Sequence, residues 1–298
     1  MENKKSKYIE IIILLLLLAA SVCFLSHIFS PENLNLPVAI NEKDRYYESI
    51  IREPENTIDT LIIGNSEAVT LVDTPRFEKE TGRSAYSVGK AGSSVADAYY
   101  TLRDITKMQD IKLVILETDM FADDNIDYSS NREELKRVFT AETEHLFPVF
   151  RYHSAWKILA GQNEGYPLNS ERGYEERTDI VPYTGGEYML PTEEVSYIPK
   201  LRVFYMNKIV KFCRKNDIDL LFVSAPSALL FNTKKHNAVS VYTEENNIPY
   251  LDLNSLNDEI GIDWTTDTMD GGDHVNENGT EKVTDYLIKC ISEVISIK

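Results

Sequence analysis

The sequence contains little cysteine and less positive than negative charge. Three cysteines occur among 298 residues, too few for a disulfide framework. Cys213 and Cys290 fall in helix-like segments without metal-ligand spacing, so we expect both to be free thiols. Lysine and arginine number 31 against 48 acidic residues, which gives a net charge of −17. Binding to nucleic-acid phosphates needs a basic surface, so this balance argues against nucleic acid as a partner.

Internal repeats and low-complexity tracts are missing too, but one long apolar run is present. Residues 11–25 are apolar except for one serine, and three lysines precede them within the first seven residues. With its flanks the run approaches the roughly 20 residues that a helix needs to cross a bilayer. Lysines stay on the cytoplasmic side, which predicts a cytoplasmic tail at 1–7, a transmembrane signal-anchor at 8–30 and an extracytoplasmic remainder. A cleaved signal peptide is the alternative.

The rest of the chain alternates short apolar runs with longer periodic segments. Residues 31–56 are rich in Pro, Asn and charge and predict a linker ending in a short helix. From residue 57 to 298 the pattern predicts strands within 59–64, 84–89, 112–118, 219–226 and 249–253, and helices within 94–108, 199–215 and 279–295. Continuous apolar strands beside amphipathic helices indicate a three-layer α/β/α fold, doubly wound around a parallel five-stranded sheet.

One connection in this pattern is unusually long. About 75 residues, 121–196, separate the third strand from the next long helix, far beyond an ordinary loop. The segment is rich in Tyr, Glu, Asn and Gly and has helix-like pieces at 131–142 and 150–161. An insertion at the carboxyl end of a strand lies where open α/β sheets bind ligands, so we expect it to form a lid.

The first strand ends in Gly64-Asn65-Ser66. The carboxyl end of that strand is a site of ligand binding in α/β sheets, so Ser66 stands where a nucleophile could attack a substrate. The alternative is a structural one, because serine is also a preferred N-cap of the helix that follows. Taken without other residues, the cap is the better interpretation.

A nucleophilic serine needs a base, and His274 is the histidine best placed to supply it. It lies in a Gly- and Asp-rich loop after the fifth strand, which a doubly wound sheet brings to the same edge as Ser66. Asp267, Asp270 and Asp273 offer carboxylates that could orient the imidazole. A metal site is the competing use of these acids, but no calcium-loop pattern is present.

Four motifs together resemble the SGNH (GDSL-like) hydrolase superfamily: IIGNSE, YSVGKAG, LVILETDMF and DGGDHVNENG. The resemblance covers residues 57–298 and is closer to membrane-anchored members, similar to the D-alanyl-lipoteichoic acid transfer protein and to alginate O-acetylation proteins. It implies that Ser66 attacks an acyl carbonyl and that His274 is the base. Backbone N–H groups of Ser66 and of Gly89 or Gly92 would then form the oxyanion hole.

The chain also departs from the superfamily pattern. Asn65 replaces the usual aspartate of the first block, and the third-block asparagine, which normally adds an oxyanion donor, is missing. The superfamily aspartate three residues before the histidine is Gly271 here. We choose Asp270 instead, since a Gly-Gly turn can fold it back onto the ring, and take Asp273 as second choice.

Several further residues are candidates for substrate binding. Asn65 follows the first strand, and Glu117 and Asp119 close the third; capping of the next turn is an equal alternative for the two acids. His153 lies in the insertion among aromatic residues, where an amphipathic helix packed on the core is the alternative. No metal and no cofactor are expected.

The resemblance and the anchor together define an expected function. The protein would be an extracytoplasmic serine acyl-esterase or O-acyltransferase that acts on a cell-surface polysaccharide or teichoic acid through an acyl-serine intermediate. The relatives also imply a membrane-bound O-acyltransferase as partner. The alternative is a non-catalytic accessory protein of the same fold that assembles with such an acyltransferase.

Overall fold

A computed structural model describes residues 2–122, 124 and 128–296 of the chain. Its sheet has five parallel strands in the order β2-β1-β3-β4-β5. The strands are β1 (Thr60–Gly64), β2 (Ala85–Gly89), β3 (Leu113–Glu117), β4 (Asp219–Ser224) and β5 (Tyr250–Asp252). Each lies within one of the predicted apolar runs, and the α/β fold with a doubly wound parallel sheet is confirmed.

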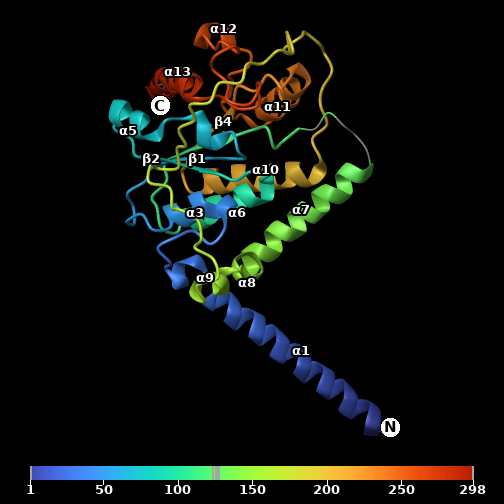
Figure 1. Cartoon of the computed structure of the whole chain (residues 1–298). Helices are drawn as coiled ribbons and strands as arrows, with labels where there is room; N and C mark the ends of the chain where they lie inside the picture. Colours follow the sequence, from blue (N-terminus) through green and yellow to red (C-terminus); the bar gives the residue numbers. More distant parts are fainter. Residues whose placement is uncertain (1, 123, 125–127, 297–298) are drawn as a thin grey trace.

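Helices cover both faces of the sheet (Figure 1). One face carries α3 (Arg45–Ile50), α6 (Val95–Ile105) and α10 (Lys200–Lys215), and the other carries α4 (Ala68–Leu71), α5 (Thr74–Thr81) and α13 (Glu277–Ser296). Along β1, Leu61 and Ile63 enter the first core and Ile62 the second, as the two-residue period of a strand requires. Burial on both faces explains why the strands are continuously apolar.

Two further helices complete the carboxyl-terminal half. α11 (Thr233–Asn246) packs beside β5, and α12 (Asn257–Ile260) contacts α13. Cys213 is buried in α10 and Cys290 is half-buried in α13, and neither forms a disulfide bond with a described residue, as predicted.

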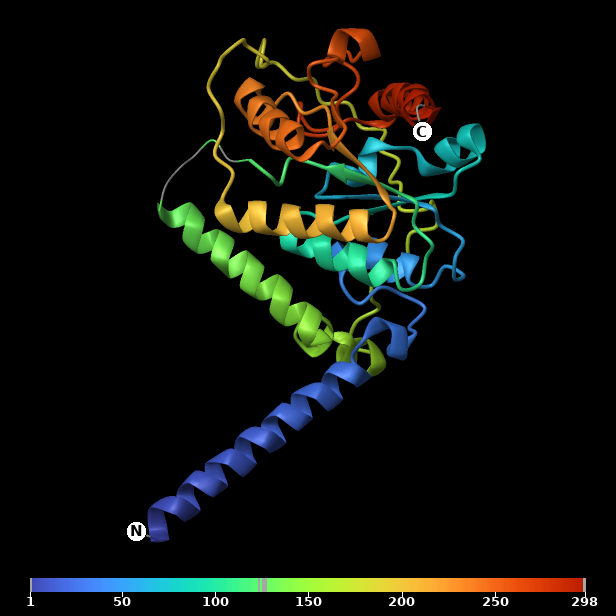
Figure 2. The same cartoon turned by 180° about the vertical axis from the view of Figure 1, so that it is seen from behind.

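The amino-terminal helix α1 (Glu2–Ile28) projects away from the domain (Figures 1 and 2). Within Ser6–Ile28, an 18-residue window has a mean hydropathy of 2.7, and only 6% of that window is buried. By length and composition this helix can cross a membrane, and a signal sequence passes the same test. Its end is fixed to the domain, because Phe29 and Leu34 pack against Tyr152 and Ala155.

The segment expected as a linker packs against the domain. It contains α2 (Pro31–Leu34), the 3₁₀ helix η1 (Glu42–Asp44) and the expected short helix, α3. Tyr46 and Ile50 of α3 are buried in the same core as β1 and β2. The segment therefore contributes to the core and brings polar residues to the edge of the sheet.

The long connection after β3 has two different halves. The first contains α7 (Tyr128–Leu146), α8 (Pro148–Tyr152) and α9 (Ala155–Leu159), where both helix-like pieces were predicted. Of these, α7 lies against α6, and α8 contacts α1. The second half returns to the sheet, where Val181 N donates to Thr268 O (3.0 Å) and Gly271 N donates to Val181 O (2.9 Å). This half thus lies beside the loop that carries His274.

Candidate active site

The carboxyl ends of β1, β2 and β3 meet at a switch point of the sheet. The chain passes from β1 to β2 on one side and then to β3 on the other side of β1, and open α/β sheets bind ligands at such points. Gly64 ends β1 beside Glu117 of β3. A Cβ atom at Gly64 would lie 2.5 Å from the Glu117 Cβ, so glycine is needed for this acid to come so close to β1.

Ser66 lies in the turn that leaves β1, directly before α4, and is half-buried. The N-cap position of α4 is Glu67, and no side chain caps the helix. The Ser66 hydroxyl instead donates to Glu67 Oε2 (3.2 Å). The capping role that the sequence favoured for Ser66 taken alone is therefore wrong, and the hydroxyl is aimed at an acidic group.

His274 is held by Asp270 through a tight loop. Gly271 and Gly272 have φ values of 84° and 102°, a region that glycine enters at little cost. This turn places Asp270 Oδ2 2.6 Å from His274 Nδ1 and lets Asp270 Oδ1 accept from His274 N (2.8 Å). Asp273 Oδ2 is farther from Nδ1, at 3.6 Å. Asp267 pairs with Lys282 Nζ instead (2.5 Å). Of the three aspartates considered from the sequence, Asp270 makes the closest contact with the imidazole.

The contact with Asp270 fixes the tautomer of the neutral imidazole. An ionised carboxylate can only accept, so Nδ1 carries a proton and Nε2 of the neutral ring is an acceptor. Nε2 of His274 is buried and has no hydrogen-bond partner among the described residues. A base with this arrangement is oriented on one side and free to take a proton on the other.

Ser66 and His274 line one pocket of about 300 Å³, here called the Ser66 pocket. Gly89 at the end of β2 shares this lining, as do residues from three other segments: Glu42, Lys43, Arg45 and Tyr46 from the η1–α3 region, Glu175 and Arg177 from the insertion, and Met269 from the His274 loop. Two residues more than 200 positions apart in the chain thus meet at the same edge of the sheet.

Glu67 lies between the serine and the histidine. It is 2% exposed, and its carboxyl group lies within 4.8 Å of a ring nitrogen of His274 and of the Asp273 carboxylate. Burial and the nearby Asp119 charge raise the pKa of Glu67 to about 7, although His274 acts in the opposite direction. Glu67 therefore changes its charge near neutral pH, at the position where the serine proton is held.

The pKa of His274 is raised above its ordinary value. Burial acts to lower it, but the carboxyl group of Glu67, the hydrogen bond to Asp270 and the charge of Asp273 outweigh that effect. The neutral imidazole that can act as a base is therefore fully formed only at a pH above the usual range for histidine.

Glu117 and Asp119 lie beneath the pocket and support the turn. Glu117 is 1% exposed, and burial together with the charge of Glu67 raises its pKa well above the usual range. Its Oε1 accepts from Asp119 N (2.7 Å). Asp119 in turn accepts from Asn65 Nδ2 (3.0 Å) and pairs with Lys235 Nζ (3.0 Å). These groups brace the Asn65–Ser66 turn from below.

The remaining predicted residues divide between the pocket and the surface. A Cβ atom at Gly89 would lie 2.5 Å from Asn65 O, so Gly89 touches the serine turn, whereas Gly92 is exposed. His153 is exposed at the end of α8, with Nδ1 3.2 Å from Phe150 O, and α8 contacts α1 and α7. Gly89 is thus the better placed of the two glycines for an oxyanion donor.

The side chains at this site are also close enough together to bind a metal ion. Ligand atoms of Glu67, Asp273 and His274 lie within 4.8 Å of one another. However, Ser66 already donates to Glu67, so an ion would have to compete for this carboxylate. This hydrogen bond favours proton chemistry over ion binding.

Sequence reasoning missed several contributors to the site, among them Glu67 and Lys235. Glu67 directly follows Ser66 in the sequence, and this adjacency of an acid to the candidate nucleophile could have identified it. Lys235 follows another lysine on α11 and looks like an ordinary surface residue, yet its side chain is only 14% exposed and pairs with Asp119.

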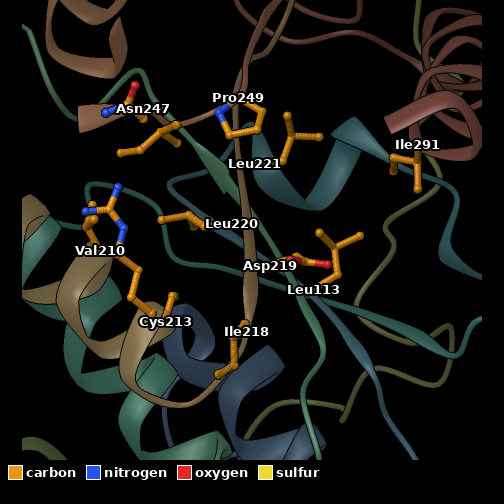
Figure 3. Close-up of a pocket in the computed structure, with 12 residues that line it drawn as sticks. Leu113, Val210, Cys213, Ile218, Asp219, Leu220, Leu221, Asn247, Pro249 and Ile291 are labelled. Atoms are coloured by element: carbon orange, nitrogen blue, oxygen red, sulfur yellow. The ribbon is translucent and has the colours of Figure 1, made fainter. Parts of the chain in front are cut away.

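A second pocket, of about 330 Å³, lies at the opposite edge of the sheet (Figure 3). It is formed at the amino ends of β3, β4 and β5 and is called the amino-end pocket. Its walls are mainly apolar and include Leu113, Val210, Cys213, Ile218, Leu220, Leu221 and Ile291. None of the residues proposed from the sequence as catalytic or substrate-binding lines it.

No protein-family model and no curated protein matches the sequence. Solved structures with a similar chain path include a GDSL-like lipase from Bacteroides thetaiotaomicron, with 12% identity and a TM-score of 0.44 over 86% of this chain and 99% of that chain. A candidate acylhydrolase from Bacteroides fragilis has 13% identity and a TM-score of 0.43 over 86% and 97% of the two chains.

A third structure is that of a candidate lipolytic protein of the G-D-S-L family from Desulfitobacterium hafniense. It has 12% identity and a TM-score of 0.43 over 78% of this chain and 99% of that chain. Similarity at this level carries no information on catalysis. The chemistry of the site therefore rests on the residues themselves.

Proposed function

We propose that the protein is a membrane-anchored, extracytoplasmic serine acyl-esterase or O-acyltransferase that acts on a cell-surface polymer. The observation that carries the proposal is the Ser66 pocket, in which a serine and an Asp270-held histidine meet at the switch point of the sheet. The resemblance of the motifs to SGNH hydrolases supports the same chemistry.

The reaction begins with proton transfer from Ser66 to His274. The hydroxyl leaves Glu67 and passes its proton to the free Nε2, while its oxygen attacks the acyl carbonyl of the substrate. Hydrogen bonds of this kind are often not yet formed without substrate. Backbone N–H groups of Ser66 and Gly89 stabilise the oxyanion. His274 then protonates the departing alkoxide oxygen, which leaves as an alcohol, and the acyl group remains on Ser66 as an ester.

The second half of the reaction decides between the two activities. Water attacking the acyl-Ser66 ester gives an esterase, and a hydroxyl group of the polymer gives a transferase. His274 removes the proton from either acceptor as it attacks, and returns it to Ser66 when the ester breaks. Asp270 stabilises the imidazolium that forms in each step.

α1 and the lysines in its first turns support this location. A helix long and apolar enough to span a membrane, with positive charge at its amino end, favours a domain outside the cytoplasm. Membrane anchoring keeps the Ser66 pocket close to the cell surface. A membrane-bound O-acyltransferase that supplies acyl groups is the partner that the motif resemblance implies.

Acyl release tests the proposal directly. Full-length protein in lipid nanodiscs is incubated with p-nitrophenyl acetate and with an O-acetylated glycan, and acetate is measured with and without a non-acetylated acceptor glycan. Activity that depends on Ser66 and survives EDTA supports serine chemistry. Activity that EDTA removes and that persists in Ser66→Ala would instead favour a metal at Glu67, Asp273 and His274.

A non-catalytic accessory role is the second proposal. It is favoured by the engagement of the Ser66 hydroxyl with Glu67 and by the missing third-block asparagine. The two functions differ in the producing cell. A Ser66→Ala chain that is expressed normally leaves the acyl content of the cell surface unchanged if the protein is a scaffold, and lowers it if the protein is an enzyme.

A further inference from the structure

The structure also contains a hollow larger than the Ser66 pocket. It has a volume of about 650 Å³ and is formed by residues 186–193 of the insertion, the start of α11, the β5–α12 connection and Trp264. We call it the Trp264 groove. None of the residues used in the acyl chemistry above lines it, so its chemistry needs a separate account.

Aromatic rings form one wall of the groove. Tyr188 and Trp264 line it, with ring centroids 5.8 Å apart and ring planes nearly perpendicular. Tyr183 packs against both rings at 6.3 Å. Edge-to-face packing of this kind fixes ring positions and leaves ring faces for a ligand with an apolar side.

A polar wall adjoins the aromatic one and is held in place by hydrogen bonds. Asp252, which is buried, accepts from His236 Nδ1 (2.7 Å), and its other oxygen accepts from Asn254 N (3.0 Å). Asn254 Oδ1 accepts from the Tyr188 hydroxyl (3.2 Å), which also accepts a hydrogen bond from Asn257. A wall fixed in this way loses little conformational entropy when a ligand binds.

Two oxygen atoms of the lining side chains have no partner. Asn257 Oδ1 and Thr233 Oγ1 are buried without a hydrogen bond to any described residue. Buried polar atoms are rarely left unpaired in folded proteins. Hydroxyl groups of a ligand, which both donate and accept, are the natural complement of such a wall.

The charge of the groove limits the kind of ligand. Its lining includes Glu187, Glu193 and Asp258, and no lysine or arginine occurs among the described residues that form it. A phosphate-bearing polymer would be repelled, because these carboxylates face it without a compensating cation. Rings with an apolar face, many hydroxyls and no negative charge fit best.

The groove is connected to the catalytic loop. Tyr183 packs against Gly272, where a Cβ atom would lie 2.7 Å from the ring, and Gly272 is two residues from His274. On the other side, His236 of the groove is next to Lys235, whose ammonium pairs with Asp119 beneath Ser66. The groove therefore adjoins the loop that carries His274 and a residue that supports the Ser66 turn.

We propose that the Trp264 groove binds a neutral or amino-sugar glycan and positions its ester for Ser66, which makes a polysaccharide rather than a teichoic acid the polymer substrate. This inference rests on the proposed acyl chemistry for the reaction but not for binding. It assigns the insertion a second role, since residues 186–193 form one side of the glycan site.

Tryptophan fluorescence provides the test, because the chain has two tryptophans, Trp156 and Trp264. Full-length Trp156→Phe protein in lipid nanodiscs reports on Trp264 alone. It is titrated with neutral tetrasaccharides of glucose, of galactose and of N-acetylglucosamine, and with lipoteichoic acid. At least one neutral tetrasaccharide is expected to change the emission saturably, and lipoteichoic acid to bind at least about tenfold more weakly.

Four variants make the result specific. Trp264→Ala, followed by calorimetry, is expected to weaken tetrasaccharide binding at least about tenfold, and the Trp156→Phe protein to bind like wild type. Asp258→Lys changes only an exposed residue and is expected to strengthen lipoteichoic acid binding. Ser66→Ala is expected to bind the tetrasaccharide normally, so loss of the acyl chemistry and loss of the groove are distinguishable.

Several outcomes would overturn the inference. Tighter binding of lipoteichoic acid than of every tetrasaccharide would assign the groove to an anionic polymer. An absence of binding by the whole panel, or wild-type affinity in a folded Trp264→Ala protein, would show that the groove is not a glycan site.

Discussion

The amino ends and the carboxyl ends of the parallel strands carry pockets of similar volume but different chemistry. The amino-end pocket, of about 330 Å³, is lined by leucine, isoleucine and valine around Cys213, whose thiol pKa burial raises to about 12. The Ser66 pocket, of about 300 Å³, contains a histidine with raised pKa and adjoins Glu67, with a pKa of about 7. A thiol that stays protonated is inert, whereas groups that titrate near neutral pH can transfer protons.

The difference shows that cavity volume does not distinguish the candidate active site from the amino-end pocket. Burial acts on both pockets, but at the carboxyl edge it acts on several acids and a histidine that also interact with one another. Clusters of perturbed titratable groups are characteristic of active sites. The predictions below separate the two edges by changing one residue at a time.

Ser66→Ala has the largest expected effect. Loss of the nucleophile should lower p-nitrophenyl acetate hydrolysis by about 10⁴-fold or more, with an unchanged melting temperature because Ser66 caps no helix. Ser170→Ala, at an exposed serine of the insertion, is the matched control and should retain wild-type activity. Equal activity of the two variants would remove Ser66 from the mechanism.

His274→Gln should be nearly as damaging. Glutamine retains a polar side chain but cannot accept the serine proton as a base, so kcat should fall by about 10³-fold or more. The double variant with Ser66→Ala should be no worse than the single variants, since the two residues act as one unit. Additive losses in steady-state kinetics would mean that they act independently.

The two aspartates beside the histidine should differ. Asp270→Asn removes the carboxylate that holds Nδ1 at 2.6 Å and should lower kcat by about 10²- to 10⁴-fold. Asp273→Asn, at 3.6 Å from the same nitrogen, should cost much less. The reverse ranking would show that Asp273 completes the triad.

Glu67→Gln should shift the pH dependence rather than abolish activity. The Glu67 carboxylate raises the pKa of His274, and activity requires the neutral imidazole, so activity is lost as pH falls through that pKa. Removing the charge lowers the pKa, and the acidic limb of kcat/KM should therefore move to lower pH. An unmoved limb would show that Glu67 does not act on the histidine.

At the amino-end pocket, Leu113→Ala should affect stability alone. The side chain is 4% exposed, and its truncation should lower the free energy of unfolding by about 2–5 kcal/mol. Activity of the folded fraction should stay at the wild-type level. Loss of activity without loss of stability would indicate that the two edges of the sheet are coupled.

The sheet and part of the site could be predicted because local patterns determine them. Strands buried on both faces are written as continuous apolar runs, so all five were identified. The contact between Asp270 and His274 follows from two adjacent glycines that turn the chain within five residues. The parallel arrangement of the strands then brings the loops after β1 and β5 to the same side of the sheet, at the carboxyl ends of the strands.

Other features depend on packing between distant segments and leave no local pattern. The η1–α3 region looks like a linker in composition, yet Arg45 and Tyr46 line the Ser66 pocket. The importance of Glu67 arises from its burial against a loop that is far away in the chain. The Trp264 groove joins parts of the insertion, α11 and the β5–α12 connection, which only the folded chain brings together.

The most direct test of the central claim is covalent labelling with a fluorophosphonate probe, mapped by mass spectrometry on full-length protein. The account predicts a single modified residue, Ser66, and a labelling rate that falls by about 10³-fold in His274→Gln. A folded wild-type protein that is modified at another residue, or not at all, would contradict the pairing of Ser66 with His274.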